Sequence, residues 1–204
     1  MFKLTDFQAF AEPSLAGRLA IIRRDLDPKF EQAGAILAEQ ATRAQLPRQT
    51  VHIAKHARRH KNPPPDTWLA LATNPRGYKM MPHVELGFWD DRLFLWVAVL
   101  KESKPLIIDA DTIASLCAGL SAQTELAGDH TDKLAARPWS PEALTMQTAR
   151  FNTVGKAEWL LGKTYLRTDP LWQTPDALWA DIRYRFDALM PVYQALTTEF
   201  SQQR

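Results

Sequence analysis

The sequence has few of the features that mark specialised protein classes. A single cysteine, Cys117, excludes an intramolecular disulfide and a multi-cysteine metal cluster. No segment reaches the roughly 18 uninterrupted apolar residues of a membrane-spanning helix. Residues 1–6 also lack the basic and apolar stretches of a signal peptide. We therefore expect a cytoplasmic protein with no membrane partner.

Common functional motifs are absent as well. The chain contains no G-x-x-x-x-G-K-[ST] phosphate loop, no G-x-G-x-x-G dinucleotide fingerprint and no G-x-S-x-G nucleophile elbow. It matches no defined nucleic-acid-binding motif, and its formal net charge of +2 is too small to indicate such a partner by itself. The sequence assigns no cofactor and no metal, so a ligand site has to be argued from local clusters of residues.

The composition is that of a folded protein. Apolar residues make up 46% of the 204 residues and charged residues 24%, and seven Trp and nine Phe supply bulky side chains for a core. A chain of this length buries roughly 70% of the surface that its unfolded form exposes. We expect one domain, residues 1–204.

Both ends of the chain predict helices. Near the start, apolar residues recur at helical spacing after Asp27 and Pro28, an N-cap followed by a proline in the first helical position. In the second half, Asp111 and Ser140 are placed to cap two further helices. A final helix should be kinked or divided at Pro191, which removes one backbone donor.

The strongest strand signal lies in the middle of the chain. Residues 83–89 alternate between two faces, Asp90 and Asp91 form a tight connection, and residues 93–100 are almost entirely apolar. Two such runs joined by a tight turn predict an antiparallel hairpin. Because the second run is apolar on both faces, we expect it to be a central strand.

Three other segments predict strands. Residues 50–56 alternate, residues 67–73 form a short apolar run, and residues 158–166 form another, with Gly162 as a candidate bulge. Strands grouped in the middle with helices on either side favour an α+β fold over regular βαβ alternation. The predicted architecture is one central, mainly antiparallel sheet with helices packed on it, flanked by N- and C-terminal helices.

A basic segment lies between residues 40 and 65. It holds six Lys and Arg residues and three His residues but no Asp or Glu. Unpaired positive charge of this density attracts phosphate, because guanidinium groups offer forked donors to phosphate oxygens. The candidate ligand-binding residues are the cations of its densest part and two beyond it: Lys55, Arg58, Arg59, Arg76 and Lys79.

The competing interpretation is that the basic segment is a solvated surface. Acidic residues such as Glu85 or Asp66 could neutralise it in space.

A second cluster of residues also allows a functional and a structural interpretation. His83 and Glu85 share one face of a predicted strand, and His56 could join them as a catalytic candidate in acid–base or metal chemistry. The alternative there is a structural His that is paired in the folded protein.

A series of short motifs runs through most of the chain. They are residues 52–59 (HIAKHARR), 62–64 (NPP), 66–68 (DTW), 76–79 (RGYK), 86–89 (LGFW), 158–162 (EWLLG) and 189–193 (LMPVY). In these motifs the chain resembles the YktB-like family of uncharacterised bacterial proteins. The resemblance implies an α+β fold with a curved antiparallel sheet and carries no established catalytic residues. The chain departs from the family pattern at His60 and Lys61, where less basic residues are usual, so those two charges fall outside a shared site.

Three hypotheses about function remain open at this point. The first is a protein that binds a phosphate-bearing ligand, either a small molecule such as a nucleotide or a nucleic acid. The second is an enzyme that uses His and Glu on an anionic substrate. The third is a structural or interaction protein whose charges only keep it soluble. The sequence decides neither whether the chain is an enzyme nor its oligomeric state.

Overall fold

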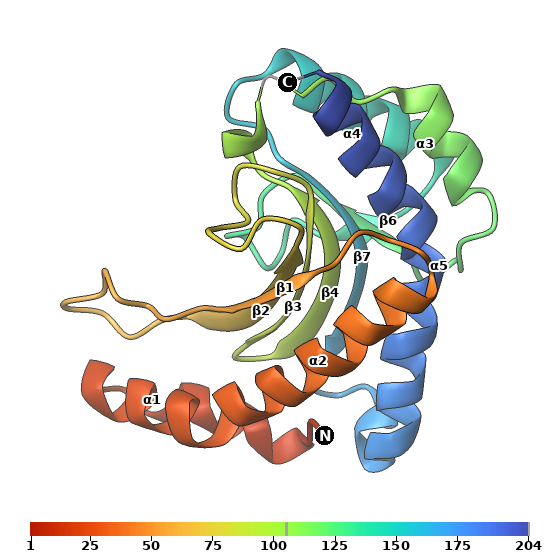
Figure 1. Cartoon of the computed structure of the whole chain (residues 1–204). Coiled ribbons are helices and arrows are strands. Elements are labelled where there is room, and N and C mark those ends of the chain that lie inside the picture. The colour runs from red at the N-terminus through yellow and green to blue at the C-terminus, as the bar shows by residue number, and fades with distance from the viewer. Residues whose placement is uncertain (105, 204) are drawn as a thin grey trace.

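Helices begin and end the chain and the strands lie between them, in a computed structural model that describes residues 1–104 and 106–203 (Figure 1). The first part contains the 3-10 helix η1 (Leu4–Ala11), α1 (Leu15–Ile21), the π-helical turn η2 (Ile22–Leu26) and α2 (Asp27–Arg43). The later helical elements are η3 (Lys101–Ser103), α3 (Ala110–Cys117), α4 (Pro141–Thr153), η4 (Pro170–Gln173) and α5 (Pro175–Gln202).

The strands of the described residues form one seven-stranded sheet in the order β1-β2-β3-β4-β7-β5-β6, with antiparallel neighbours throughout. β3 and β4 form the predicted hairpin, and β4 is the middle strand, as its two apolar faces indicate. The α+β prediction is confirmed. The strands are β1 (Thr50–Ile53), β2 (Asp66–Ala72), β3 (His83–Trp89), β4 (Arg92–Val99), β5 (Glu125–Ala127), β6 (Arg137–Pro138) and β7 (Trp159–Leu166).

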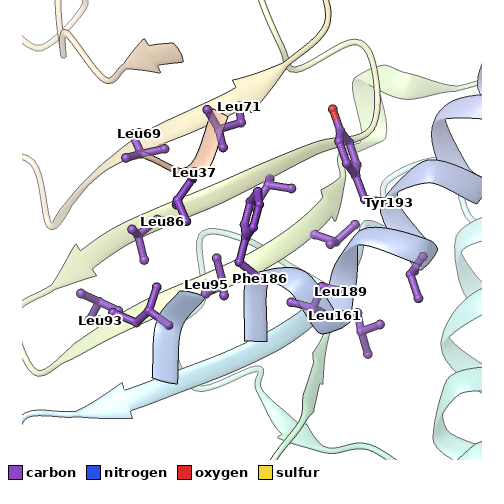
Figure 2. Packing of buried hydrophobic residues seen from close by; sticks show 14 of the residues in the cluster. Leu37, Leu69, Leu71, Leu86, Leu93, Leu95, Leu161, Phe186, Leu189 and Tyr193 are labelled. Carbon is purple, nitrogen blue, oxygen red and sulfur yellow. The ribbon is translucent and has the colours of Figure 1, made fainter. Parts of the chain in front are cut away.

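Helices α2 and α5 cover one face of this sheet (Figure 1). Figure 2 shows Leu37 of α2 and Phe186 of α5 among alternate leucines of β2, β3, β4 and β7. Each fully buried Leu or Phe stabilises the fold by roughly 1.5–3 kcal/mol. Only alternate residues of each strand face these helices. If one strand shifted by one residue against its neighbour, its polar side chains would point into the core, so the strand register is well determined.

The opposite face of the sheet carries polar groups. His83 and Glu85 lie there, side by side on β3, and are buried. Their cross-strand neighbours differ in size: Ala98 of β4 pairs with His83, whereas Glu85 pairs with Ala70 of β2 and Trp96 of β4. The ring of Tyr78 from the β2–β3 loop packs on this face against His83. This second face, which we call the loop-covered face, holds the candidate site.

Two details of the sheet and the last helix differ from prediction. Gly162 is not a bulge, because it pairs in regular register with Trp96. A Cβ there would lie 1.9 Å from the backbone oxygen of Leu95, so glycine is required by close approach of the two strands. Helix α5 runs undivided through Pro191, so division of the helix is contradicted, and a kink at Pro191 stays a prediction. Because proline has no N–H, the carbonyl of Asp187, four residues earlier, lacks a helical hydrogen bond. Pro191 and Asp187 are both exposed, so water can donate to that carbonyl.

The N-caps of the helices agree only in part with those predicted from the sequence. Ser140 caps α4 as expected and accepts a hydrogen bond from Ala143 N–H at 3.1 Å. Helix α3 is capped by Asp109 instead of Asp111, whose backbone N–H donates to the Asp109 carboxylate at 3.1 Å. Asp27 is not an N-cap, because α1, η2 and α2 follow one another without an extended residue between them. Across the described residues, no helix combines the length and the apolar composition needed to cross a membrane.

Candidate functional site

A cavity of about 580 Å³ opens on the loop-covered face, beside β2. Its wall comes from the loop between β1 and β2, residues 54–65, which extends beyond the sheet (Figure 1). Asp66 and Trp68 of β2, two residues of the β2–β3 loop and Glu102 of η3 complete it. We call it the basic cavity, and its lining residues are Ala54, Lys55, His56, Ala57, Arg58, Arg59, Asp66, Trp68, Tyr78, Lys79 and Glu102.

Local backbone structure holds the wall of the basic cavity in place. Ala54 N–H donates to Trp68 C=O at 2.9 Å and extends the β1–β2 pairing by one residue. His56 then adopts a left-handed conformation (φ 50°), and Arg59 N–H closes a turn onto His56 C=O at 3.0 Å. A left-handed residue other than glycine costs roughly 1–2 kcal/mol. Such strain persists where the surroundings enforce it and is concentrated at functional sites.

Four exposed cations surround this cavity. Across residues 1–104 and 106–203, none of them forms an ion pair or a side-chain hydrogen bond. A cavity of about 570 Å³ between η1 and α2 provides a contrast, because Lys29 there is paired with Asp6 and Arg24 with Asp25. Cations without ion-pair partners therefore distinguish the basic cavity from the cavity between η1 and α2, and these four are Lys55, Arg58, Arg59 and Lys79.

Aromatic side chains form the inner wall of the basic cavity. The indole N–H of Trp68 donates to the hydroxyl oxygen of Tyr78 at 2.9 Å, which holds the two half-buried side chains together. The His56 ring lies edge-on to Trp68, with centroids 5.8 Å apart. Burial and the nearby charge of Glu85 raise the pKa of Tyr78, so its hydroxyl stays protonated at neutral pH. The wall therefore offers planar apolar surface next to cations.

Two cavity residues have pKa values far from their ordinary ranges. Burial, with the charges of Arg59 and Arg23, lowers the pKa of His56 to about 4, so the ring is neutral at pH 7. Its Nε2 lies 3.1 Å from the Thr67 hydroxyl oxygen. Burial also raises the pKa of Asp66 to about 6; Glu85 acts in the same direction and Arg59 opposes it. The cavity thus combines a neutral imidazole with a carboxyl group that titrates near physiological pH.

His83 and Glu85 lie behind the wall and form a buried pair. The two nitrogens of His83 lie 2.8 Å from Met81 C=O and 3.1 Å from a Glu85 carboxylate oxygen. Both partners are acceptors when Glu85 is ionised, so the ring must then carry two protons. Burial acts to raise the pKa of Glu85, but the hydrogen bond and charge of His83 prevail and lower it. The two side chains form a buried hydrogen-bonded pair, and their exposures of 0% and 2% keep them from direct contact with a ligand.

A second His–Glu pair lies on the same face. His130, in the loop after β5, donates its backbone N–H and its Nδ1–H to one oxygen of Glu158, at 2.8 and 2.6 Å. Burial alone would lower the pKa of His130, but the Glu158 hydrogen bond and the charges of Glu85 and Glu158 raise it overall. Asp129 lies beside this pair, and the three side chains bring their ligand atoms within 4.8 Å of one another.

The structure brings together most of the residues that the sequence singled out. Lys55, His56, Arg58, Arg59 and Lys79 line the basic cavity. Arg76 lines an adjacent cavity of about 370 Å³ that shares Tyr78 and Lys79 with it, and His83 and Glu85 lie behind the Tyr78 ring.

Sequence reasoning missed several polar residues of this face. Asp66 was considered only as a neutralising charge, and Asp129, His130 and Glu158 were not considered as a site. Their spacing in the sequence carries no motif, because His130 and Glu158 meet only through sheet pairing, with Glu158 N–H bonded to Gly128 C=O at 3.2 Å. A local signal existed for Tyr78 alone, which lies between Arg76 and Lys79 in the sequence.

Comparisons with known proteins place this chain in a family. Residues 2–193 match the family model described as Domain of unknown function (DUF1054). A UPF0637 protein of Lacticaseibacillus paracasei is 47% identical over 196 residues, covering 96% of this chain and 97% of the relative. UPF0637 proteins of Latilactobacillus sakei subsp. sakei and Enterococcus faecalis are 43% and 34% identical, covering 98% and 95% of this chain and 100% and 97% of each relative.

Proposed function

The chain belongs to the DUF1054 family, in keeping with its resemblance to YktB-like proteins, and we propose that it binds a nucleotide in the basic cavity. The single observation that carries this proposal is the set of four exposed cations without ion-pair partners around one concave surface. In the described chain, the comparable cavity between η1 and α2 has its cations already neutralised.

The charges in the basic cavity support an anionic ligand. Lys55, Arg58, Arg59 and Lys79 face two acidic residues, Asp66 and Glu102. Because the pKa of Asp66 is about 6, its charge is easily removed by a proton when an anion enters. Two arginines separated by one peptide bond can present forked donors to phosphate oxygens, which is how guanidinium groups recognise phosphate.

The size and the wall of the cavity favour a nucleotide over a nucleic acid. A volume of about 580 Å³ falls in the range of small-molecule sites. The Trp68 and Tyr78 side chains supply aromatic surface against which a base can pack, at roughly 1–3 kcal/mol per stacked base. Duplex DNA needs a broad basic surface, and four neutralised phosphates would give a log–log salt slope near about −3.6. A slope of that size for DNA would favour the nucleic-acid alternative.

Calorimetric titration with ADP, adenosine and inorganic phosphate tests the proposal. We expect ADP to bind more tightly than either fragment. Arg59→Ala should weaken ADP binding roughly 10- to 100-fold, since a hydrogen bond to a charged group contributes about 1.5–3 kcal/mol. The matched control is Arg150→Ala, an exposed arginine of α4 outside the cavity, which should bind like the wild type. Equal binding of ADP by both variants would contradict the proposal.

One observation favours acid–base catalysis as a second candidate function. His56 is neutral at pH 7 and Asp66 titrates near pH 6, and both line the basic cavity. Two groups whose environments separate their pKa values can act as base and acid on one ligand. His83 and Glu85 would then support the Tyr78 wall without touching the substrate. If this function holds, His56→Ala should remove turnover of the bound nucleotide while ADP affinity changes by less than about threefold. A second variant, Asp66→Asn, should shift the pH dependence of turnover.

A further inference from the structure

We infer that Asp129, His130 and Glu158 bind a zinc ion. This inference goes beyond nucleotide binding and does not depend on it. The three residues lie on the loop-covered face, where the loop after β5 meets the start of β7. One imidazole nitrogen and one oxygen from each carboxylate lie within 4.8 Å of one another. Ligand atoms about 2.0–2.2 Å from one tetrahedral zinc ion lie about 3.3–3.6 Å apart, so the side chains have to move closer together when the ion binds.

The backbone of the sheet holds these residues together. Ala127 of β5 pairs with Leu160 of β7, and one step further Glu158 N–H donates to Gly128 C=O at 3.2 Å. His130 N–H donates to the Glu158 carboxylate at 2.8 Å. The ligands are therefore positioned by paired strands before an ion arrives, which limits the ordering that binding has to impose.

Burial gives the site an inner side and an open side. Glu158 is 3% exposed, and the His130 side chain is 14% exposed, whereas Asp129 is exposed. Asp129 and His130 also line a cavity of about 10 Å³, close to the smallest volume that holds a single water molecule. An ion can enter past Asp129, and water can complete its coordination.

Charges of both signs surround the cluster. Glu85 lies near enough for its negative charge to act on His130, in addition to Glu158. Opposing charges come from Lys79, which acts on His130, and Lys101, which acts on Asp129. Glu85 is itself paired with His83, and Arg92 and Lys133, which line the same small cavity, are paired with Asp90 and Asp91. An added divalent cation would replace the hydrogen bond between His130 and Glu158 with metal–ligand bonds.

The donor set selects the metal. Imidazole nitrogen suits Zn²⁺ and disfavours Mg²⁺ and Ca²⁺, which prefer sites made entirely of oxygen. Two carboxylates and one imidazole make three protein ligands, the number found in open zinc sites where a fourth position is left for water. The cluster therefore points to zinc in preference to a hard divalent cation.

Calorimetric titration of the full chain with ZnCl₂, after treatment with a chelator, tests the inference. We expect binding of one ion per chain, with no comparable binding of MgCl₂. His130→Ala and Asp129→Ala should each weaken binding at least about 100-fold, since even the loss of an outer-shell partner costs 10- to 100-fold. His60→Ala, which removes an exposed histidine of the β1–β2 loop, is the matched control and should bind like the wild type.

A second readout separates metal binding from folding. Zinc should raise the melting temperature of the wild type and of His60→Ala, but not that of Asp129→Ala. Asp129 is exposed, so its variant should keep the wild-type circular dichroism spectrum and decide the question even if His130→Ala fails to fold. Zinc binding that is unchanged in Asp129→Ala, or MgCl₂ binding as tight as zinc, overturns the inference.

Discussion

Replacing Asp66 with asparagine should stabilise the protein at neutral pH and leave its stability unchanged in acid. Asp66 is a buried carboxyl whose pKa rises from 3.8 to about 6 in the folded state, mainly because burial disfavours its charge. Below about pH 4 the carboxyl is protonated in both the folded and the unfolded chain. Between about pH 4 and 6 the unfolded chain loses this proton first, so the free energy of unfolding of the wild type falls as pH rises.

The shift sets the size of the effect. A rise of roughly two pKa units corresponds to about 3 kcal/mol, at about 1.4 kcal/mol per unit. Asn is nearly isosteric with Asp and carries no charge, so Asp66→Asn should gain up to about 3 kcal/mol above pH 6. For a chain of this length, 1 kcal/mol moves the melting temperature by about 2–4 °C, so the expected rise is on the order of 5–10 °C.

Thermal unfolding of the wild type and Asp66→Asn at pH 4 and pH 7.5 measures this difference. The two melting temperatures should lie close together at pH 4, where only part of the linkage effect has developed, and separate fully at pH 7.5. Asp187→Asn, at an exposed position of α5, is the control and should stay within about 0.5 kcal/mol of the wild type at both pH values. An Asp66→Asn variant that is less stable at pH 7.5, or equally shifted at both pH values, would refute the account of Asp66 as a carboxyl held in the cavity at the expense of stability.

Three further predictions concern the fold. Gly162→Ala places a Cβ 1.9 Å from the Leu95 carbonyl oxygen. It should lower the free energy of unfolding, measured by urea denaturation, by more than about 3 kcal/mol. A change below about 1 kcal/mol would show that β4 and β7 are not so close at this position. His83→Leu leaves Glu85 buried without its hydrogen-bond partner and should lower the free energy of unfolding by about 3–5 kcal/mol at pH 7. The double variant His83→Leu/Glu85→Leu should lose less, and equal stability of the single and double variants would contradict the pairing of His83 with Glu85. Ser140→Ala removes the cap of α4 and should cost about 1 kcal/mol, seen as a fall in the denaturation midpoint; no fall would mean that water replaces the cap.

Much of the fold could be predicted from local pattern. The alternation in β3 and the apolar residues on both faces of β4 reflect which side of each strand is covered, so they indicate both the hairpin and the central position of β4. The order of the remaining strands could not be read in this way. β7 lies next to β4 although 59 residues, 100–158, lie between them, and β5 and β6 have only three and two residues, too few to show a period.

In the candidate site, too, only the residues that are close in sequence could be predicted. Lys55, Arg58 and Arg59 are close in sequence and lie in one loop, so a local cluster of charge indicates their common surface. The perturbed titration of Asp66 is a consequence of burial, which sequence spacing does not express. The pairing of His130 with Glu158 requires the register of β5 on β7, which is set by the packing of the whole sheet.

Nuclear magnetic resonance of the indole N–H groups tests nucleotide binding in the basic cavity most directly. The chain has seven Trp residues, and among the described lining residues of this cavity Trp68 is the tryptophan, with its indole N–H bonded to Tyr78. Addition of ADP should shift the Trp68 indole signal progressively and saturably, while the six other indole signals stay in place. A Trp68 signal that does not move at millimolar ADP, or shifts confined to other tryptophans, would contradict the account.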